Sequence, residues 1–137
     1  MGHWGVKSFE NDDADEALDA GFDRVHGDAY DELMDDRNPM TFDQVQKKLA
    51  NAETLKAAVE TLQETVGKPF EEWDEVERLA FVGVVVRHAE FGVPIPEDLK
   101  LRAMDWLEHE EIEWDEATAR RLRRRKEIDL LKKTASS

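Results

Sequence analysis

Apolar residues recur every three or four positions along much of this chain, the spacing that places side chains on one face of an α-helix. Thr41 and Gln44 have the spacing of a capping box, and Gly67 and Pro69 are typical of a helix end. Between them the pattern predicts helix throughout, with Asn51 as the point where it could be interrupted. The apolar stripe consists of Val45, Leu49, Ala52, Leu55, Val59, Leu62 and Val66.

Two further helices are predicted nearer the N-terminus. The first is capped by Asn11 or Asp12, carries acidic residues in its first turn, and ends at Gly21. The second spans 22–36 and stops before Pro39, because the residue preceding a proline avoids the helical region. Its apolar face is formed by Phe22, Val25, Ala29 and Leu33.

The stretch 70–91 has a mixed signal. Its β-branched residues between Leu79 and Val86 favour a strand. However, a run of about 20 residues without a turn signal suits a buried helix better than a strand of ordinary length. We therefore expect a central helix ending before Gly92, followed by a helix with Pro96 in its first turn. The residues of that next helix that face one way are Leu99, Ala103, Trp106 and Leu107.

These elements predict an all-α fold, organised as a single compact domain over 1–137 with five to six helices. The last helix begins near Trp114 and runs to about Lys133. Its C-terminal bases suit the negative end of the helix dipole. Residues 132–137 are expected to form a flexible tail.

An N-terminal arm, residues 1–10, carries Trp4 and Phe9, which we expect to dock on the helical body because aromatic side chains bury large areas. This makes the opening motif a structural clasp. The alternative is that the same motif binds a partner or ligand. The candidate site residues in that case are Trp4, Phe9, Asn11, Asp12 and Asp13.

The opening residues also carry a resemblance. They read Met1-Gly2-x-Trp4-Gly5-x-x-x-Phe9-Glu10-Asn11-Asp12-Asp13-Ala14, with Asp15 following. This resembles a bacterial family of unknown function that opens M-G-x-W-G-x-x-x-F-[ED]-N-D-x-A-x-D. A weaker similarity covers Ala80 to Trp106, whereas Glu16 and Ala17 stand where the family commonly has Trp or Leu. The resemblance implies a small, mainly helical bacterial protein and no particular activity.

Composition narrows the possible functions. The 137 residues include 33 Asp and Glu against 19 Lys and Arg, a net charge of −14. Such an acidic chain argues against general binding to DNA, RNA or anionic lipid, since phosphate contacts need clustered cations. With no cysteine, disulfides, thiolate metal sites and cysteine nucleophiles are excluded. No signal-peptide pattern and no apolar run of about 20 residues is visible. We therefore expect a cytoplasmic protein without membrane association.

The charge is unevenly distributed. Residues 1–45 carry a net charge of −10 and residues 46–115 one of −9, whereas residues 116–137 carry +5. The basic patch consists of Arg120, Arg121, Arg123, Arg124, Arg125 and Lys126. It could contact nucleic acid by releasing counterions. Two other roles, taken together, explain the patch better than nucleic-acid binding does. It could neutralise the protein's own acidic head, residues 1–45, or it could pair with an acidic partner.

No catalytic arrangement is visible. Serine occurs only at Ser8, Ser136 and Ser137, and no phosphate-binding loop is present. We therefore expect a protein that is not an enzyme, with no catalytic residues and no cofactor.

Metal binding has little support in the sequence. The helical pairs Asp23/His26 and Asp105/His109 could hold a metal ion, but such pairs more commonly form surface ion pairs. The acidic run 108–113 lacks the alternating oxygens and the glycine of a calcium loop, so it predicts a solvated face. We expect no metal.

Two functions remain. The first is a non-enzymatic, acidic protein–protein interaction module that binds a basic partner by charge complementarity, such as an immunity protein or inhibitor of a basic toxin or nuclease. The second is a small carboxylate-based metal- or ligand-binding protein centred on the N-terminal motif. A third reading is that the acidity only keeps the protein soluble.

Overall fold

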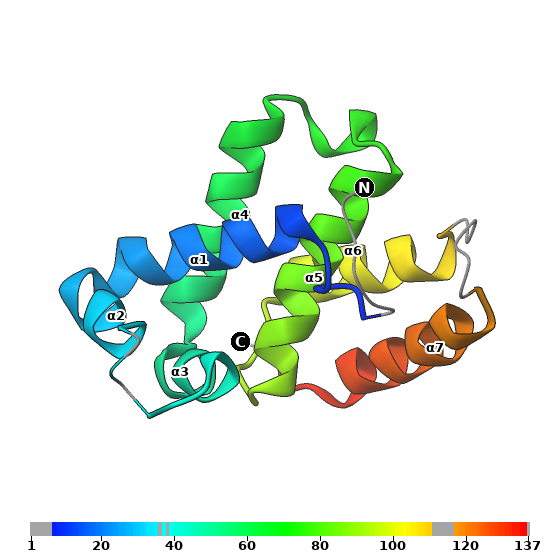
Figure 1. Ribbon diagram of the computed structural model, residues 1–137. Helices are drawn as coiled ribbons and strands as arrows, with labels where there is room; N and C mark the ends of the chain where they lie inside the picture. Colours follow the sequence, from blue (N-terminus) through cyan, green and yellow to red (C-terminus); the bar gives the residue numbers. More distant parts are fainter. Residues whose placement is uncertain (1–6, 36, 38, 111–116, 137) are drawn as a thin grey trace.

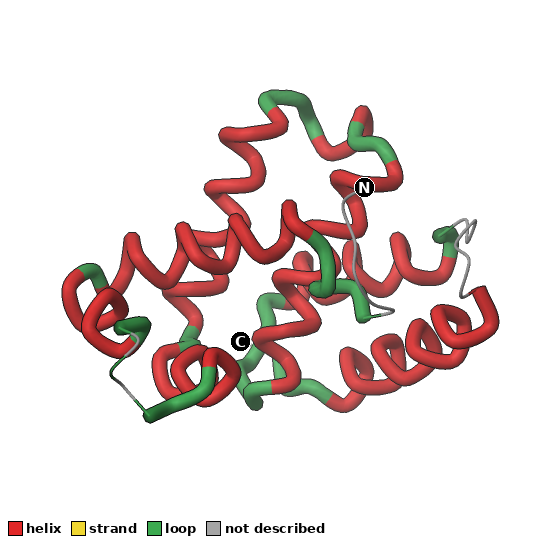
Figure 2. The backbone as a smooth tube through the Cα atoms, viewed as in Figure 1, coloured by secondary structure: helices red, strands yellow, loops and turns green. Residues whose placement is uncertain are grey.

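The helices predicted from periodicity account for nearly all of the regular structure. The computed structural model describes residues 7–35, 37, 39–110 and 117–136. Within these ranges the chain forms seven α-helices and one short 3-10 helix, η1, and the all-α prediction is confirmed (Figures 1 and 2). The predicted start of the last helix near Trp114 lies outside the described residues. The elements are α1 (Asp12–His26), α2 (Asp28–Leu33), α3 (Phe42–Leu49), α4 (Ala52–Val66), η1 (Phe70–Glu72), α5 (Glu75–Glu90), α6 (Glu97–Glu108) and α7 (Ala117–Lys133).

Helix α5 is the centre of the fold. Helices α1, α4, α6 and α7 all contact it, and every residue from Ala80 to Ala89 is buried. The β-branched run with strand propensity is therefore helical, because burial on all sides outweighs local preference. Asp74 begins the helix: its side chain accepts a hydrogen bond from the backbone N–H of Glu77 at 2.9 Å.

Helix α1 differs from the prediction. It continues through Gly21 to His26, so the predicted end at Gly21 and the predicted separate helix over 22–36 are both wrong. A Cβ at Gly21 would lie 2.9 Å from the Cβ of Ala58, so this glycine allows α1 and α4 to approach closely. The break comes instead at Gly27, whose φ of 53° ends α1 and leads into α2.

The long apolar stripe forms two helices, separated at the residue named as the possible interruption. Ala50 is extended, and Asn51 caps α4 by accepting a hydrogen bond from the backbone N–H of Thr54 at 2.9 Å. The capping box at the start of α3 is present as predicted: the Thr41 and Gln44 side chains each accept from the other's backbone N–H. Both helices turn most of the stripe toward the same core, whereas Ala52, predicted as part of it, is exposed.

The C-terminal segment lies along the start of α6. The backbone N–H of Ile95 donates to the carbonyl oxygen of Ala135 at 2.9 Å, and the Lys100 ammonium donates to that of Thr134 at 2.9 Å. Lys132 and Lys133, the first residues of the predicted tail, belong to α7. The flexibility of 132–137 stays a prediction, but its described residues beyond α7 are attached to α6.

No helix in the described part of the chain has both the length and the apolar character that a bilayer span requires.

Candidate functional site

The described part of the arm crosses the central helix at a glycine. Residues 7–10 form a turn in which the backbone N–H of Lys7 donates to Oε1 of Glu10 at 3.1 Å. A Cβ at Gly83 would lie 2.5 Å from the carbonyl oxygen of Ser8 and 2.8 Å from Cα of Phe9. The arm therefore sits where only a glycine in α5 leaves room for its backbone.

Asn11, the central residue of the opening motif, has both ends of its amide occupied within the chain. Its Oδ1 accepts from the backbone N–H of Ala14 at 2.8 Å, and its Nδ2 donates to the carbonyl oxygen of Ser8 at 2.6 Å. Asn11 is thus the N-cap, and Asp12 is not. Of the other predicted site residues, Asp12 and Asp13 are exposed in the first turn of α1, and Trp4 lies outside the described residues.

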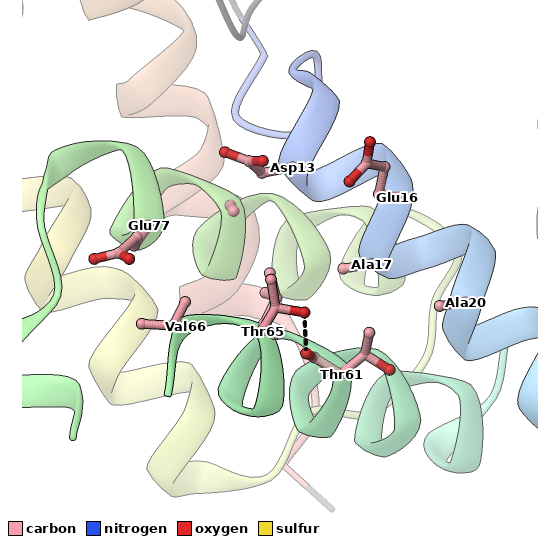
Figure 3. A pocket seen from close by; sticks show the side chains of 10 residues that line it. Asp13, Glu16, Ala17, Ala20, Thr61, Thr65, Val66 and Glu77 are labelled. Atoms are coloured by element: carbon pink, nitrogen blue, oxygen red, sulfur yellow. Dashed lines mark hydrogen bonds between the residues drawn. The ribbon is translucent and has the colours of Figure 1, made fainter. Parts of the chain in front are cut away.

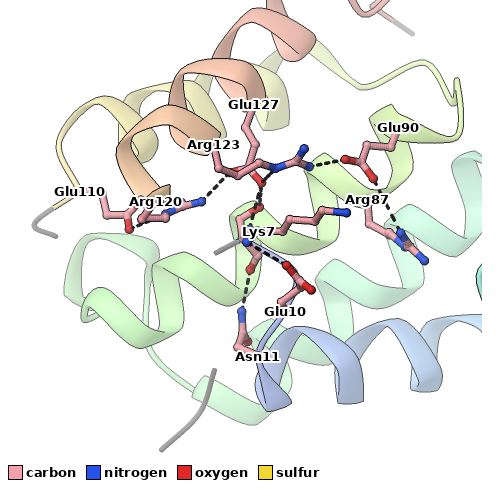
Figure 4. A network of polar contacts seen from close by, with 10 residues as sticks. Lys7, Glu10, Asn11, Arg87, Glu90, Glu110, Arg120, Arg123 and Glu127 are labelled. Atoms are coloured by element: carbon pink, nitrogen blue, oxygen red, sulfur yellow. Dashed lines mark hydrogen bonds and ion pairs between the residues drawn. The ribbon is translucent and has the colours of Figure 1, made fainter. Parts of the chain in front are cut away.

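A buried carboxylate that the sequence analysis did not single out holds the arm. Oε2 of Glu127, on α7, accepts hydrogen bonds from the backbone N–H and the hydroxyl of Ser8, both at 2.9 Å (Figure 4). Its other oxygen accepts from Nη1 of Arg120 at 2.9 Å, and Arg123 Nε lies 3.2 Å from Oε2. The spacing of Glu127 behind two arginines, seven and four residues earlier, was the available signal.

Half of the basic patch is internal. Arg120 is fully buried and pairs with Glu110 at 2.6 Å, while Arg124 donates to the Glu110 carbonyl oxygen at 2.9 Å. Burial lowers the pKa of Arg120, but the hydrogen bond to Glu110 and the charge of Glu127 outweigh that effect, so the pKa lies above its ordinary value. The exposed members of the patch are Arg121, Arg125 and Lys126.

The solvated face predicted for the acidic run 108–113 is wrong at Glu110. Its side chain is only 8 % exposed because Arg120 of α7 covers and pairs with it. Residues 111–113 lie outside the described residues. The internally paired arginines of the basic patch thus neutralise Glu90, Glu110 and Glu127. None of these three residues belongs to the acidic head at 1–45.

The pairs continue into a chain of alternating charges. Arg123 contacts Glu90, and Glu90 lies 3.7 Å from Arg87 (Figure 4). Arg87 in turn contacts Asp43 on α3. Phe9 lies between two of these cations, with its ring centroid 4.6 Å from the Arg87 guanidinium and 6.0 Å from that of Arg123. We call this row from Glu110 to Asp43 the ion-pair chain. It links the segment that follows α6 with α7, α5, α3 and the arm.

A groove with a carboxylate rim lies between α1, α4 and the start of α5. It has a volume of about 350 Å³ and is called the acidic groove (Figure 3). Its apolar floor is formed by Ala17, Ala20, Leu62, Val66 and Ala80. Asp13 and Glu16 of α1 and Glu77 of α5 supply the carboxylates. The groove brings one predicted site residue, Asp13, together with groups far away in the chain.

Two of the three rim carboxylates are open to a partner. Among the described residues, Asp13 and Glu16 form no hydrogen bond or ion pair with their side chains. Glu77 pairs with Lys68 at 3.2 Å and accepts from the backbone N–H of Asp74 at 2.9 Å. The hydroxyls of the two lining threonines donate to backbone carbonyls one turn earlier and are not available. The groove therefore offers an apolar floor with negative charge at its edge.

The electrostatic environment along α1 is negative. Burial raises the pKa of Asp15 above its usual value, and the charges of Asp19 and Asp12 raise it further. Burial also raises the pKa of Tyr30, whose hydroxyl donates to Oδ1 of Asp19 at 2.5 Å. A cation placed on this helix would relieve carboxylate repulsion.

The histidine pairs do not form a metal centre in the part of the molecule that is described, where no three His, Asp or Glu residues are close enough to hold an ion. Nδ1 of His109 lies 3.2 Å from Oδ1 of Asp105, and both side chains are exposed. His26 contacts the Leu49 carbonyl oxygen at 2.7 Å.

His88 is a second buried polar group that the sequence did not reveal. Its Nδ1 lies 2.9 Å from the carbonyl oxygen of Val84 and so carries the proton, and its Nε2 lies 2.8 Å from Oγ1 of Thr54. Burial lowers its pKa to about 4, so the ring is neutral at pH 7. It does not line the acidic groove and belongs to the core.

Comparison of the chain with protein-family models found no match, and neither did comparisons with curated proteins and with solved structures. The resemblance of the opening motif to a bacterial family therefore stays a prediction. So do the expected cytoplasmic location and the expectations of no cofactor and no catalytic activity.

Proposed function

We propose that this chain is a non-enzymatic interaction module that binds a basic segment of a partner protein in the acidic groove. The observation that carries the proposal is the groove itself, in which an apolar floor is bordered by Asp13 and Glu16, two carboxylates without an internal partner. Neither side chain accepts a capping hydrogen bond or forms an ion pair within the described fold. They are therefore available for intermolecular contacts.

The groove suits the chemistry of lysine and arginine. These side chains have an aliphatic stem that packs on apolar surface and a cationic head that stays at a polar edge. In the proposed complex the stem lies on Ala17, Ala20 and Leu62, and the head meets the rim carboxylates. An uncharged apolar side chain would leave the negative rim unpaired.

The charge of the whole molecule supports the same partner. With a net charge of −14, the chain attracts a basic protein before contact and raises the rate of association. Much of the negative charge is on α1, which lines the groove, and on α2, which follows the far end of α1 and does not line the groove. The exposed acids there are Asp12, Asp13, Glu16, Asp19, Asp23, Asp28, Asp31 and Glu32. Inhibition of a basic toxin or nuclease is one biological form that this binding could take.

A binding experiment with a matched control tests the groove. The probe is a fluorescent lysine-rich peptide, and its acetyl-lysine counterpart removes the charge while keeping the length of the side chain. The double variant Asp13→Asn/Glu16→Gln should weaken binding by about 5- to 30-fold, the effect of two exposed ion pairs. The double variant Asp31→Asn/Glu32→Gln makes the same charge change on α2 and should lose much less.

Two results would contradict the proposal. Equal weakening by the two double variants would mean that the peptide responds to overall charge and not to the groove. Unchanged binding of the acetyl-lysine peptide would mean that cations are not what the groove recognises. A natural partner can then be sought by affinity capture at low and moderate salt. Its binding is measured again with the two purified proteins.

A small-ligand function is the second candidate. Of its two forms, metal binding and ligand binding, the ligand form has a supporting observation beside the arm, in a hollow that contains a buried amide without a partner.

A further inference from the structure

Gln46, on α3, has a buried side chain whose hydrogen bonds are only half satisfied. The residue has no exposed surface, and its Oε1 accepts from Nε of Arg87 at 2.8 Å. That bond fixes which way the amide points, because a flipped amide would place the NH₂ group of Gln46 against the N–H of Arg87. Its Nε2 has no hydrogen-bond partner in the described structure. Burying an amide donor in this way disfavours folding unless something else accepts from it.

Gln46 is one of the residues that line a hollow formed by four segments. The arm, α1, α3 and α5 surround a space of about 180 Å³, which admits a molecule of several heavy atoms and not only one water. Its lining consists of Lys7, Phe9, Glu10, Asp15, Leu18, Asp43, Gln46 and Arg87. Because the arm closes one side, the hollow exists only when the N-terminal motif is docked.

Two charged side chains of the hollow have no ion-pair partner in the described part of the chain, although the Lys7 ammonium lies over the Phe9 ring, 5.6 Å from its centroid. Within the described residues, Lys7 and Asp15 form no ion pair and no side-chain hydrogen bond. The other charges are used: Asp43 contacts Arg87, and Glu10 accepts from the backbone N–H of Lys7. The open groups are therefore an amide donor, an ammonium group and a carboxylate. Burial and the charges of neighbouring acids raise the pKa of Asp15, and Arg87 offsets this only in part, so a further cation beside Asp15 would be stabilising.

We propose that this hollow binds a small zwitterion, such as an amino acid with a short side chain or an ω-amino acid. Its carboxylate accepts from the amide of Gln46 and from the ammonium of Lys7, and its own ammonium pairs with Asp15. This arrangement satisfies all three open groups with one molecule. The proposal is independent of the acidic groove, because neither Asp13 nor Glu16 lines the hollow.

The test uses calorimetric titration for affinity and NMR of the Gln46 side-chain amide for location. The probes are glycine, β-alanine and γ-aminobutyrate, with acetate and methylammonium as partners that carry only one charge. At least one zwitterion should shift the Gln46 amide signal saturably at concentrations up to about ten millimolar. Acetate and methylammonium should bind at least about ten-fold more weakly, since each leaves one charged group unpaired.

Conservative variants test whether the zwitterion binds in the hollow. Gln46→Glu keeps the oxygen that contacts Arg87 and removes the donor, while Asp15→Asn removes the charge at constant size. Each should weaken zwitterion binding by at least about ten-fold. Asp23→Asn makes the same charge change at an exposed position of the same helix, outside the hollow, and should leave the affinity within about two-fold. Circular dichroism checks that each variant is folded.

Three outcomes would overturn the proposal. If no probe shifts the Gln46 signal, the hollow holds water only. If Asp15→Asn and Gln46→Glu bind the zwitterion as tightly as the parent chain, the binding lies elsewhere. If acetate or methylammonium binds as tightly as the zwitterions, the hollow recognises single charges.

Discussion

At the scale of single residues, the buried imidazole of His88 makes stability depend on pH. Its pKa is lowered to about 4 by burial, against an ordinary 6.5 in the unfolded chain. As the pH falls below 6.5 the unfolded chain takes up a proton that the folded chain does not, so folding stability decreases until about pH 4. The loss over this window amounts to about 3 kcal/mol.

Urea unfolding of the parent chain and of His88→Gln at several pH values between 7 and 4 measures this effect. The variant should lose less stability over the window than the parent, although its stability at pH 7 is lower. His109→Gln, which removes an exposed histidine, should keep the pH dependence of the parent. If His88→Gln also keeps the pH dependence of the parent, groups other than His88 cause the loss of stability at low pH.

A second residue-scale prediction concerns Gly83. An alanine inside a helix normally stabilises it relative to glycine. Here the added Cβ would meet the arm backbone at 2.5 Å, so Gly83→Ala should destabilise the protein by about 1–3 kcal/mol. Hydrogen exchange at residues 7–10 should accelerate, because the arm is pushed from α5. A stabilised variant with unchanged exchange would show that the arm does not dock there.

At the scale of elements, Glu127 connects the arm to α7. Glu127→Gln leaves Arg120 and Arg123 buried or half-buried with less compensating charge, so it should destabilise the protein by about 3 kcal/mol. Asp129→Asn, the same change at an exposed position of α7, should stay within about 0.5 kcal/mol of the parent. Urea unfolding separates the two. Equal effects would mean that Glu127 is not the connecting residue.

The floor of the acidic groove gives a further element-scale prediction. Ala20 is half-buried on α1, so Ala20→Arg can place its own cation near the rim without opening the core. It should reduce binding of the lysine-rich peptide by about ten-fold or more while changing stability little. Fluorescence anisotropy measures the affinity. Undiminished binding would place the peptide away from the floor.

The sequence could predict most of the elements but not how they meet. Apolar spacing and capping residues such as Thr41 and Asn51 act locally, so they were visible without a structure. Gly21 was misread because its role depends on Ala58, 37 positions later, which no local pattern reveals. The burial of Arg120 likewise depends on its pairing with Glu110 and Glu127. The sequence of a basic run does not show whether its side chains are solvated or buried.

The candidate site was predictable to a smaller extent. Asp13 was named from the opening motif, but Glu77 joins it only because α1 and α5 pack together. The hollow beside the arm forms only where four separate segments meet. Nothing in the sequence around Gln46 indicates that its side chain is buried there. Asn11, by contrast, was named both as a possible ligand-binding residue and as a cap, and its contacts are those of a cap.

At the scale of the whole molecule, charge is separated in space as it is along the chain. Helices α1 and α2 (blue to cyan) lie toward one side in Figure 1 and α7 (orange to red) toward the other. The exposed acids of the former and the exposed bases of the latter therefore form different surfaces. A basic partner should be guided to the α1 side, and its association rate should fall with added salt.

The proposed binding of a basic segment in the acidic groove can be located on the protein by NMR. On titration with the lysine-rich peptide, the largest backbone amide shifts should fall in 13–20 of α1 and 61–66 of α4, with small shifts in α2. Shifts spread evenly over the exposed acids of α1 and α2, or concentrated away from both groove helices, would contradict it.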